Sequence, residues 1–224
     1  MSAQGVFITG TDTGVGKTWI GSNLCAYLYQ NDILVTPRKP VESGCEKSAT
    51  GVLLPADAYA YFDACNQATM LNTICPYRYE AAIAPDQAAE LVGKTLNLEM
   101  LVNACTREQA DQFLLVEGAG GFYSPIARDA LNADLARSLG LPILLVAADR
   151  LGAINHTLLT AEAIQKSGLK LVAVVLNQME MKAHENMDNA ESLEKYLDCP
   201  VLSVAYQAEK DMRWKQQLTI LLLG

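Results

Sequence analysis

The feature that most constrains the fold of this chain is a glycine-rich stretch near its N-terminus, FITGTDTGVGKTWI. The apolar run 6–9 predicts a strand, and apolar residues at helical spacing over 18–30 predict a helix. Backbone N–H groups in such a loop, and at the helix start behind it, bind anionic oxygens, and Gly14 and Gly16 permit a close approach. We therefore expect residues 10–18 to form a P-loop that binds a nucleoside triphosphate with Mg²⁺.

Two details of this loop narrow its class. Five residues, rather than the four of the strict pattern, separate Gly10 from Gly16. Within the loop, Lys17 is expected to reach the terminal phosphates and the Thr18 hydroxyl to bind Mg²⁺. The position that carries a second lysine in P-loop ATPases of the partitioning type is Asp12, which argues against an ATPase that reaches a partner subunit with that lysine.

The rest of the chain alternates short apolar runs with longer segments of helical periodicity. Further strands are predicted over 33–36, 113–116, 142–147, 171–176 and 201–204, and further helices over 56–68, 97–109, 131–139, 154–166, 188–197 and 212–223. The segment 71–91 is the least regular, and we expect it to run over the surface near the site. Strands this apolar are buried on both faces, as in parallel sheets covered by helices. The pattern predicts one α/β domain over 1–224, with a P-loop NTPase-type, doubly wound, mainly parallel sheet and helices on both faces.

Composition excludes several kinds of partner. The formal net charge is −8, so an anionic nucleic acid is not expected as a partner. No apolar run approaches the ~20 residues that a spanning helix needs. The N-terminal stretch MSAQGVFITG also lacks the basic start of a signal peptide. We expect a cytoplasmic protein. Its six scattered cysteines, with no CxxC pair, are expected to be reduced thiols.

Polar residues gather after the predicted strands, where ligands of a doubly wound sheet bind. Lys39 and Ser43 follow strand 33–36 in the sequence RKPVESG, and Glu117 follows strand 113–116 in EGAGG. A carboxylate at the end of such a strand suits Mg²⁺, so Glu117 is a candidate metal ligand. Taken alone, Lys39 is better explained as a solvated lysine. Asp57, at the start of a predicted helix, could equally be a helix cap or a first-turn acid.

Taken together, the motifs resemble those of the dethiobiotin synthetase family, the ATP-dependent cyclo-ligases of biotin synthesis. The matching pieces are GTDTGVGKT, KPVESG, the aspartate of PADAYAY, VEGAGG, LGAINHTLLTAEAI and VVLN, in the family's order from Thr9 to Asn177. The resemblance implies that 7,8-diaminononanoate takes up CO₂ (or bicarbonate) as a carbamate. The carbamate attacks the γ-phosphate of ATP, and the mixed anhydride closes to the cyclic urea with release of ADP and phosphate.

The resemblance also implies roles for particular residues. Lys39, Lys17 and Thr13 would be catalytic, with Thr13, Lys39 and Ser43 near the substrate, and Thr18, Asp57 and Glu117 would hold Mg²⁺. The implied ATP contacts are Gly14, Val15, Gly16, Lys17, Thr18, Trp19, Asp57, Glu117, Gly118, Ala119, Gly120 and Asn177. A homodimer is implied, in which Gly152, Ala153, Ile154 and Asn155 of the neighbouring subunit bind the substrate carboxylate.

Two parts of the sequence depart from the family pattern. A Gly-Glu-Ile-Pro-like turn that lines the base pocket is replaced by Ser203, Val204, Ala205 and Tyr206, and Asp86 stands where relatives often have histidine. The chemistry of the residues also leaves two other functions open. One is a P-loop small-molecule kinase, which would release a stable phosphorylated product. The other is a nucleotide-switch or assembly ATPase, which would show negligible turnover of small molecules.

Overall fold

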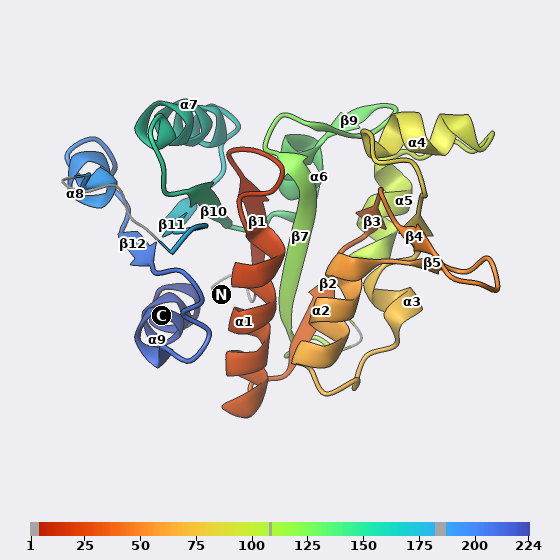
Figure 1. Ribbon diagram of the computed structural model, residues 1–224, viewed down its shortest axis with the longest axis horizontal. Coiled ribbons are helices and arrows are strands. Elements are labelled where there is room, and N and C mark those ends of the chain that lie inside the picture. Colours follow the sequence, from red (N-terminus) through yellow and green to blue (C-terminus); the bar gives the residue numbers. More distant parts are fainter. Residues whose placement is uncertain (1–4, 108, 182–186) are drawn as a thin grey trace.

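The computed structural model describes residues 5–107, 109–181 and 187–224, and its centre is a six-stranded parallel sheet. The strand order is β12-β11-β10-β1-β7-β2 (Figure 1). These strands are β1 (Gly5–Gly10), β2 (Val35–Arg38), β7 (Phe113–Gly121), β10 (Ile143–Ala148), β11 (Leu171–Asn177) and β12 (Val201–Val204). The chain leaves β1 first toward β2 and β7 and later toward β10, so the loop after β1 lies where the strand order reverses. That position is where open α/β sheets bind ligands.

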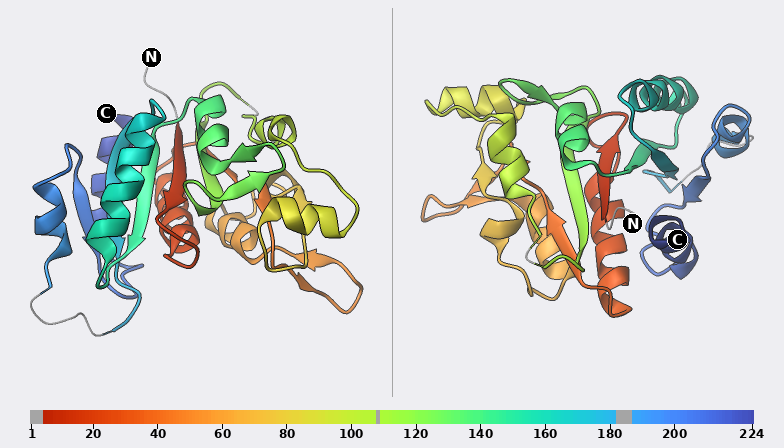
Figure 2. Two further views of the ribbon diagram at one scale, coloured as in Figure 1. Left: turned by 90° about the horizontal axis from the view of Figure 1, so that it is seen from above. Right: turned by 180° about the vertical axis from the view of Figure 1, so that it is seen from behind.

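Helices cover both faces of this sheet (Figure 2). On one face lie α1 (Lys17–Gln30), α2 (Ala56–Ala64) and α9 (Met212–Leu223); on the other lie α5 (Leu98–Ala104), α6 (Asn132–Leu139), α7 (Ala153–Lys166) and α8 (Asn189–Glu194). Successive side chains of β1 alternate between the two cores: Val6 and Ile8 pack with α1, whereas Phe7 packs in the opposite cluster. All three are fully buried, and the predicted doubly wound α/β fold is confirmed.

Several predicted boundaries were wrong for identifiable reasons. Strand β2 begins at Val35 rather than at Ile33, because the Ile33 N–H still donates to Leu28 O in the turn that ends α1. Strand β7 runs on through the EGAGG segment to Gly121, which pairs with Gly10. Helix α2 ends at Ala64, because Asn66 and Gln67 adopt left-handed backbone angles of 49° and 62° in φ. Helices α5 and α8 are also shorter than predicted.

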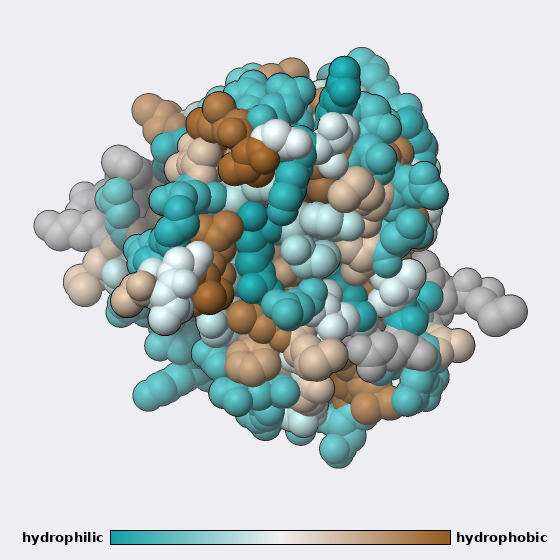
Figure 3. All heavy atoms as spheres, turned by 90° about the vertical axis from the view of Figure 1, so that its right-hand side faces the viewer, coloured by the Kyte–Doolittle hydropathy of each residue, from teal (hydrophilic) through white to brown (hydrophobic). Residues whose placement is uncertain are grey.

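The segment 71–91 is more regular than predicted. It contains α3 (Leu71–Ile74), β6 (Tyr77–Arg78) and α4 (Pro85–Leu91), and β6 pairs with β3 (Val41–Glu42) just after β2. Two small hairpins complete this side of the molecule, β4–β5 (Glu46–Lys47 with Leu53–Leu54) and β8–β9 (Pro125–Ala127 with Ala130–Leu131). Figure 3 shows this side, on which hydrophobic residues form small patches separated by hydrophilic ones.

The cysteines are all unpaired, and five of the six are buried. Within the described residues, no helix has the length and apolar character needed to cross a membrane. Residues 1–4, which form part of the stretch considered for a signal peptide, lie outside the described residues.

Candidate active site

A cavity of about 760 Å³ lies at the carboxyl ends of β1, β2 and β7. Twelve residues predicted for the site line it: Thr13, Gly14, Gly16, Lys17, Thr18, Trp19, Lys39, Ser43, Asp57, Glu117, Ala119 and Gly120. It is also lined by Glu42, Ser124 and Pro125, which were not predicted, and by residues 82–85 of the segment that was expected to run near the site. Residues from five separate stretches of chain therefore converge on one cavity.

The loop after β1 has the backbone geometry of a phosphate-binding loop. Gly16, with φ of 92°, is the N-cap of α1, and a Cβ there would lie 2.1 Å from Asn177 Nδ2. Glycine is favoured at this position, because side chains are disfavoured at positive φ and a Cβ would displace the Asn177 amide. Within the loop, Thr13 N–H donates to the Asp12 carboxylate at 2.7 Å, and Lys17 Nζ donates to Asp12 O at 2.9 Å.

The register of the sheet brings Lys39 and Glu117 together. Arg38 of β2 pairs with Val116 of β7. The residues that follow them, Lys39 and Glu117, therefore lie side by side. Lys39 Nζ lies 2.6 Å from Glu117 Oε1 and 2.8 Å from Asp57 Oδ2, and it donates to Gly118 O at 3.0 Å. Lys39 is 3% exposed and Glu117 is 1% exposed. A solvated lysine at position 39 is therefore ruled out.

The two lysines of the cavity differ in their electrostatic surroundings. Burial alone would lower the pKa of Lys39, but the charges of Glu117 and Asp57 outweigh it and hold this pKa well above its ordinary value. For Lys17, burial and then the charge of Lys39 lower the pKa to about 8, against the weaker attraction of the acidic groups nearby. Burial would raise the pKa of Asp57, but Lys39 and Thr18 bring it below its usual range.

Glu42 is a site residue that sequence reasoning missed. Its carboxylate oxygens accept hydrogen bonds from the N–H groups of Asp57 and Ala58 at 3.0 and 3.1 Å. A residue from a distant segment therefore provides the acceptors that N–H groups in the first turn of α2 lack within the helix. Asp57 is therefore a first-turn residue that faces Lys39; the interpretation of Asp57 as the helix cap was wrong, because the N-cap position is Pro55. Burial and the Asp57 charge raise the pKa of Glu42. No spacing rule connects positions 42 and 57.

Asn132 is a second unpredicted residue, and it holds the glycine-rich end of β7. It is fully buried, accepts Ala119 N–H at 2.9 Å and donates to the carbonyl oxygens of Ala119, Gly121 and Ser124. A Cβ on Gly118 would lie 2.4 Å from Asn132 Oδ1. This network fixes the backbone that forms one side of the cavity.

The donor atoms around Thr18 are of the kind that Mg²⁺ prefers. Thr18 Oγ1 donates to Glu117 Oε1 at 2.9 Å, and the Asp57 carboxylate is joined to the same group through Lys39. Within the described residues, no cluster of three or more histidine, cysteine or acidic side chains could hold a metal by itself. Two carboxylates and a hydroxyl fit Mg²⁺, which is usually held by one or two carboxylates together with substrate phosphates.

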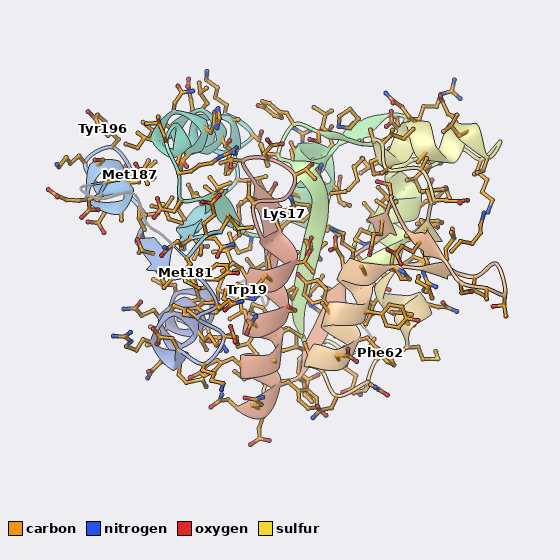
Figure 4. The ribbon with its side chains drawn as sticks, in the orientation of Figure 1. Lys17, Trp19, Phe62, Met181, Met187 and Tyr196 are labelled. Carbon is orange, nitrogen blue, oxygen red and sulfur yellow. The ribbon has the colours of Figure 1, made fainter. Side chains whose placement is uncertain are left out.

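Another part of the predicted ATP site lies beside α9. Trp19, in the first turn of α1, stacks on Trp214 of α9, with ring centroids 5.9 Å apart and an interplanar angle of 24°. Figure 4 labels Trp19 on the side of α1 that faces α9, and Lys17 near the loop above it. Asn177, the last residue of β11, donates through Nδ2 to Val15 O at 3.1 Å and to Met179 Sδ at 2.9 Å.

Some predicted residues do not line the cavity. Val15, Gly118 and Asn177 are not among its lining residues, and Gly152–Asn155 lie at the start of α7. The segment that replaces the family's Gly-Glu-Ile-Pro-like turn begins in β12, which contains Ser203 and Val204. Ala205 and Tyr206 follow the end of that strand. Asp86 lies in the first turn of α4.

Comparisons with known proteins show what the chain as a whole is similar to. A family model described as an AAA domain matches residues 4–210. The ATP-dependent dethiobiotin synthetase BioD of Ruthia magnifica subsp. Calyptogena magnifica is 39% identical over 198 residues, covering 88% of this chain and 89% of its own. The enzyme of the same name from Vesicomyosocius okutanii subsp. Calyptogena okutanii is 44% identical over 176 residues, covering 79% of each. A ParA family ATPase from Chlorobium tepidum TLS, 13% identical over 99% of this chain and 92% of its own, superposes with a TM-score of 0.50, which supports the fold alone.

Proposed function

Because the chain belongs to the dethiobiotin synthetase family, we propose that it uses ATP and CO₂ to convert 7,8-diaminononanoate into the cyclic urea dethiobiotin. The observation that carries this proposal is the pair of buried lysines, Lys17 and Lys39, on one cavity with a phosphate-binding loop. In the proposed sequence, one amine takes up CO₂ as a carbamate. A carbamate oxygen then attacks the γ-phosphorus of ATP with release of ADP. Finally the second amine attacks the carbamate carbon and expels phosphate with that oxygen.

The central difficulty of this chemistry is repulsion between two anions. At a separation of ~4 Å and an effective dielectric of ~20, two like unit charges repel by about 4 kcal/mol. Lys17 and Lys39 supply positive charge on the cavity surface where the carbamate and the γ-phosphate must meet. The effect is electrostatic stabilisation of the transition state by groups already in place. No nucleophilic side chain is needed, since the substrate supplies both nucleophiles.

We propose that Thr18, Asp57 and Glu117 hold Mg²⁺, as their donor chemistry supports. The bound ion would supply further charge neutralisation at the triphosphate. Lys39 then has two duties: it balances Asp57 and Glu117, and it faces the carbamate. Glu42 keeps Asp57 in place through the start of α2.

The substrate would occupy the end of the cavity away from α9. Thr13 and Ser43 contribute hydroxyls there, and Ile83, Ala84 and Pro85 contribute apolar surface that suits a methylene chain. We propose that the carboxylate at the end of that chain is bound by residues Gly152–Asn155 of a second subunit in a homodimer. Those residues form the N-terminus of α7, and backbone N–H groups at a helix start suit a carboxylate, although the Ala153 N–H donates to Arg150 O at 3.0 Å.

The base would lie between Trp19 and Asn177. The Asn177 side chain donates two hydrogen bonds through Nδ2, and within the described residues none reaches Oδ1. Oδ1 can therefore accept a hydrogen bond from an exocyclic amino group, which adenine and cytosine present and uracil lacks. We propose that ATP and CTP are used in preference to UTP. The segment Ser203–Tyr206 lacks the Gly-Glu-Ile-Pro-like turn, so that turn does not take part in selecting the base.

The test is to identify the product by mass spectrometry after incubation with the diamine, ¹³C-bicarbonate and MgATP. The expected product is the cyclic urea with ¹³C in its ring carbonyl, and phosphate release should require both the diamine and bicarbonate. A stable phosphorylated product would instead indicate a kinase. Nucleotide-dependent complexes without turnover would indicate an assembly ATPase.

A further inference from the structure

Tyr61 is a buried side chain of α2 that points at the site from behind the cavity. It is fully buried, and its hydroxyl donates to Glu117 Oε2 at 2.7 Å. It does not line the cavity and cannot touch a ligand there. Nothing in the sequence pattern singled it out, since a tyrosine in PADAYAY reads as an ordinary core residue.

The hydrogen bonds of Glu117 are divided between its two oxygens. Oε1 accepts from Thr18 Oγ1 and from Lys39 Nζ, both of which line the cavity. Oε2 accepts from Tyr61 on the other side. The glutamate side chain can rotate about the torsions near its carboxylate. A hydrogen-bond donor to Oε2 restricts this rotation and so keeps Oε1 directed toward the cavity. Without that donor, Oε2 would be buried and short of a partner.

A glycine on the neighbouring helix makes room for this hydroxyl. Gly21 lies inside α1, where glycine is disfavoured relative to alanine. A Cβ at Gly21 would lie 2.0 Å from Tyr61 Oη, 2.9 Å from Ile8 Cδ1 and 3.0 Å from Tyr61 Cζ. The closest of these contacts is to the hydroxyl that binds Glu117. Gly21 and Tyr61 thus act together to bring a hydrogen-bond donor to Glu117.

We propose that Tyr61 is a positioning residue, which directs Glu117 Oε1 toward Thr18 and the Mg²⁺ that accompanies the triphosphate. The proposal rests on the Mg²⁺ and phosphate site of the proposed function. Outer residues that orient a metal ligand typically change metal affinity or activity by about 10–100-fold when they are altered. Tyr61 would act on the metal-dependent part of nucleotide binding and leave the metal-independent part unchanged.

The test compares Tyr61→Phe with Tyr59→Phe, a half-exposed tyrosine on the same helix whose ring contacts Phe62. Thermal unfolding of the full chain is followed with adenylyl imidodiphosphate while Mg²⁺ is titrated. Tyr61→Phe should raise the Mg²⁺ concentration at half of the stabilisation by about tenfold, whereas Tyr59→Phe should leave it at the wild-type value. The stabilisation by nucleotide without Mg²⁺ should not change.

A lower melting temperature of Tyr61→Phe with an unchanged Mg²⁺ midpoint would overturn the proposal, since Tyr61 would then serve stability alone. If the wild type shows no Mg²⁺-dependent stabilisation, the metal site of the proposed function fails instead.

Gly21→Ala is a second variant that tests the same hydrogen bond. It keeps the Tyr61 hydroxyl but moves it away from Glu117, so it remains informative if Tyr61→Phe does not fold. It should raise the midpoint in the wild type and add little in the Tyr61→Phe background. Equal increases in both backgrounds would contradict the proposed coupling.

Discussion

Lys17 and Lys39 line the same cavity, are both buried, and yet are held by different means. Lys39, at the end of β2, lies between two carboxylates at 2.6 and 2.8 Å. Lys17, in the loop after β1, donates to a backbone carbonyl of that loop, and no carboxylate of the described residues forms an ion pair with it. The pKa of Lys39 is accordingly raised, whereas burial and the neighbouring Lys39 lower the pKa of Lys17 to about 8.

The difference indicates which charge is part of the fold and which depends on a ligand. The charge of Lys39 is balanced by Asp57 and Glu117 before any ligand binds. The charge of Lys17 remains poorly compensated until an anion arrives, and a triphosphate is such an anion. Removing each lysine should therefore have opposite effects on the stability of the ligand-free protein.

Lys39→Met should give the largest loss. Turnover should fall by about 10²–10³, the scale for one lost charge-stabilising group, while nucleotide affinity stays nearly intact. Stability of the ligand-free protein should fall by about 3 kcal/mol, because the variant leaves Glu117 buried without its cationic partner. Phosphate-release assays, nucleotide titrations and denaturant unfolding measure the three quantities.

The matched control for this variant is Lys47→Met, which removes a lysine from the β4–β5 hairpin. Lys47 is about half exposed and pairs with the exposed Glu80, so turnover and stability should hardly change. Full turnover in Lys39→Met would contradict the role given to Lys39.

Lys17→Met should lower affinity for every nucleoside triphosphate by about 100-fold, because the lost contact is to phosphate. It should also raise the stability of the ligand-free protein by about 1–3 kcal/mol, since a buried cation with a lowered pKa is removed. Isothermal titration and unfolding of the same preparation measure both. A variant that binds poorly and is also less stable would break the comparison between the two lysines.

Asn177→Ala should weaken binding of the nucleotide base and leave binding of the phosphates unchanged, in contrast to the two lysine variants. We expect KM for ATP to rise about tenfold with kcat unchanged, since one hydrogen bond to the base is lost. KM for UTP should barely change. Equal losses for ATP and UTP would indicate that Asn177 acts through the loop, to which it donates at Val15 O.

The comparison of the two lysines also predicts a pH dependence of stability. The folded-state pKa of Lys17, about 8, lies below the ordinary value of 10.5, so the unfolded chain binds more protons between these values. The cost of the charged Lys17 is fully present below pH 8 and is relieved as pH rises toward 10.5. The wild type should therefore gain stability relative to Lys17→Met across this window. Parallel unfolding curves for the two proteins over pH 7.5–10 would contradict the lowered pKa.

How far the sequence predicts this site depends on the range of the interactions. The P-loop is local, so its lysine, threonine and glycines follow from a short pattern in which Gly16 must have positive φ. Lys39 and Glu117 were found because both follow predicted strands, and the register of β2 and β7 then brings them into contact. The bounds of β2 were misjudged by two residues, because the turn after α1 extends to Ile33.

The unpredicted residues act over long sequence distances. Glu42 binds backbone N–H groups 15 and 16 residues away, Asn132 binds the end of β7 from α6, and Tyr61 reaches Glu117 56 positions along the chain. Each is an ordinary residue in its local context. Only the packing of α2 and α6 on the sheet gives them their partners, and periodicity carries no information about such partners.

The most direct test of the central claim follows the oxygen of bicarbonate. If a carbamate oxygen attacks the γ-phosphorus and leaves with it on ring closure, ¹⁸O-labelled bicarbonate must deliver one ¹⁸O to the released phosphate. Mass spectrometry of the phosphate after a single turnover, with the diamine and MgATP in unlabelled water, should show a shift of about two mass units. Unlabelled phosphate accompanied by the cyclic urea would contradict phosphorylation of a carbamate at the site between Lys17 and Lys39.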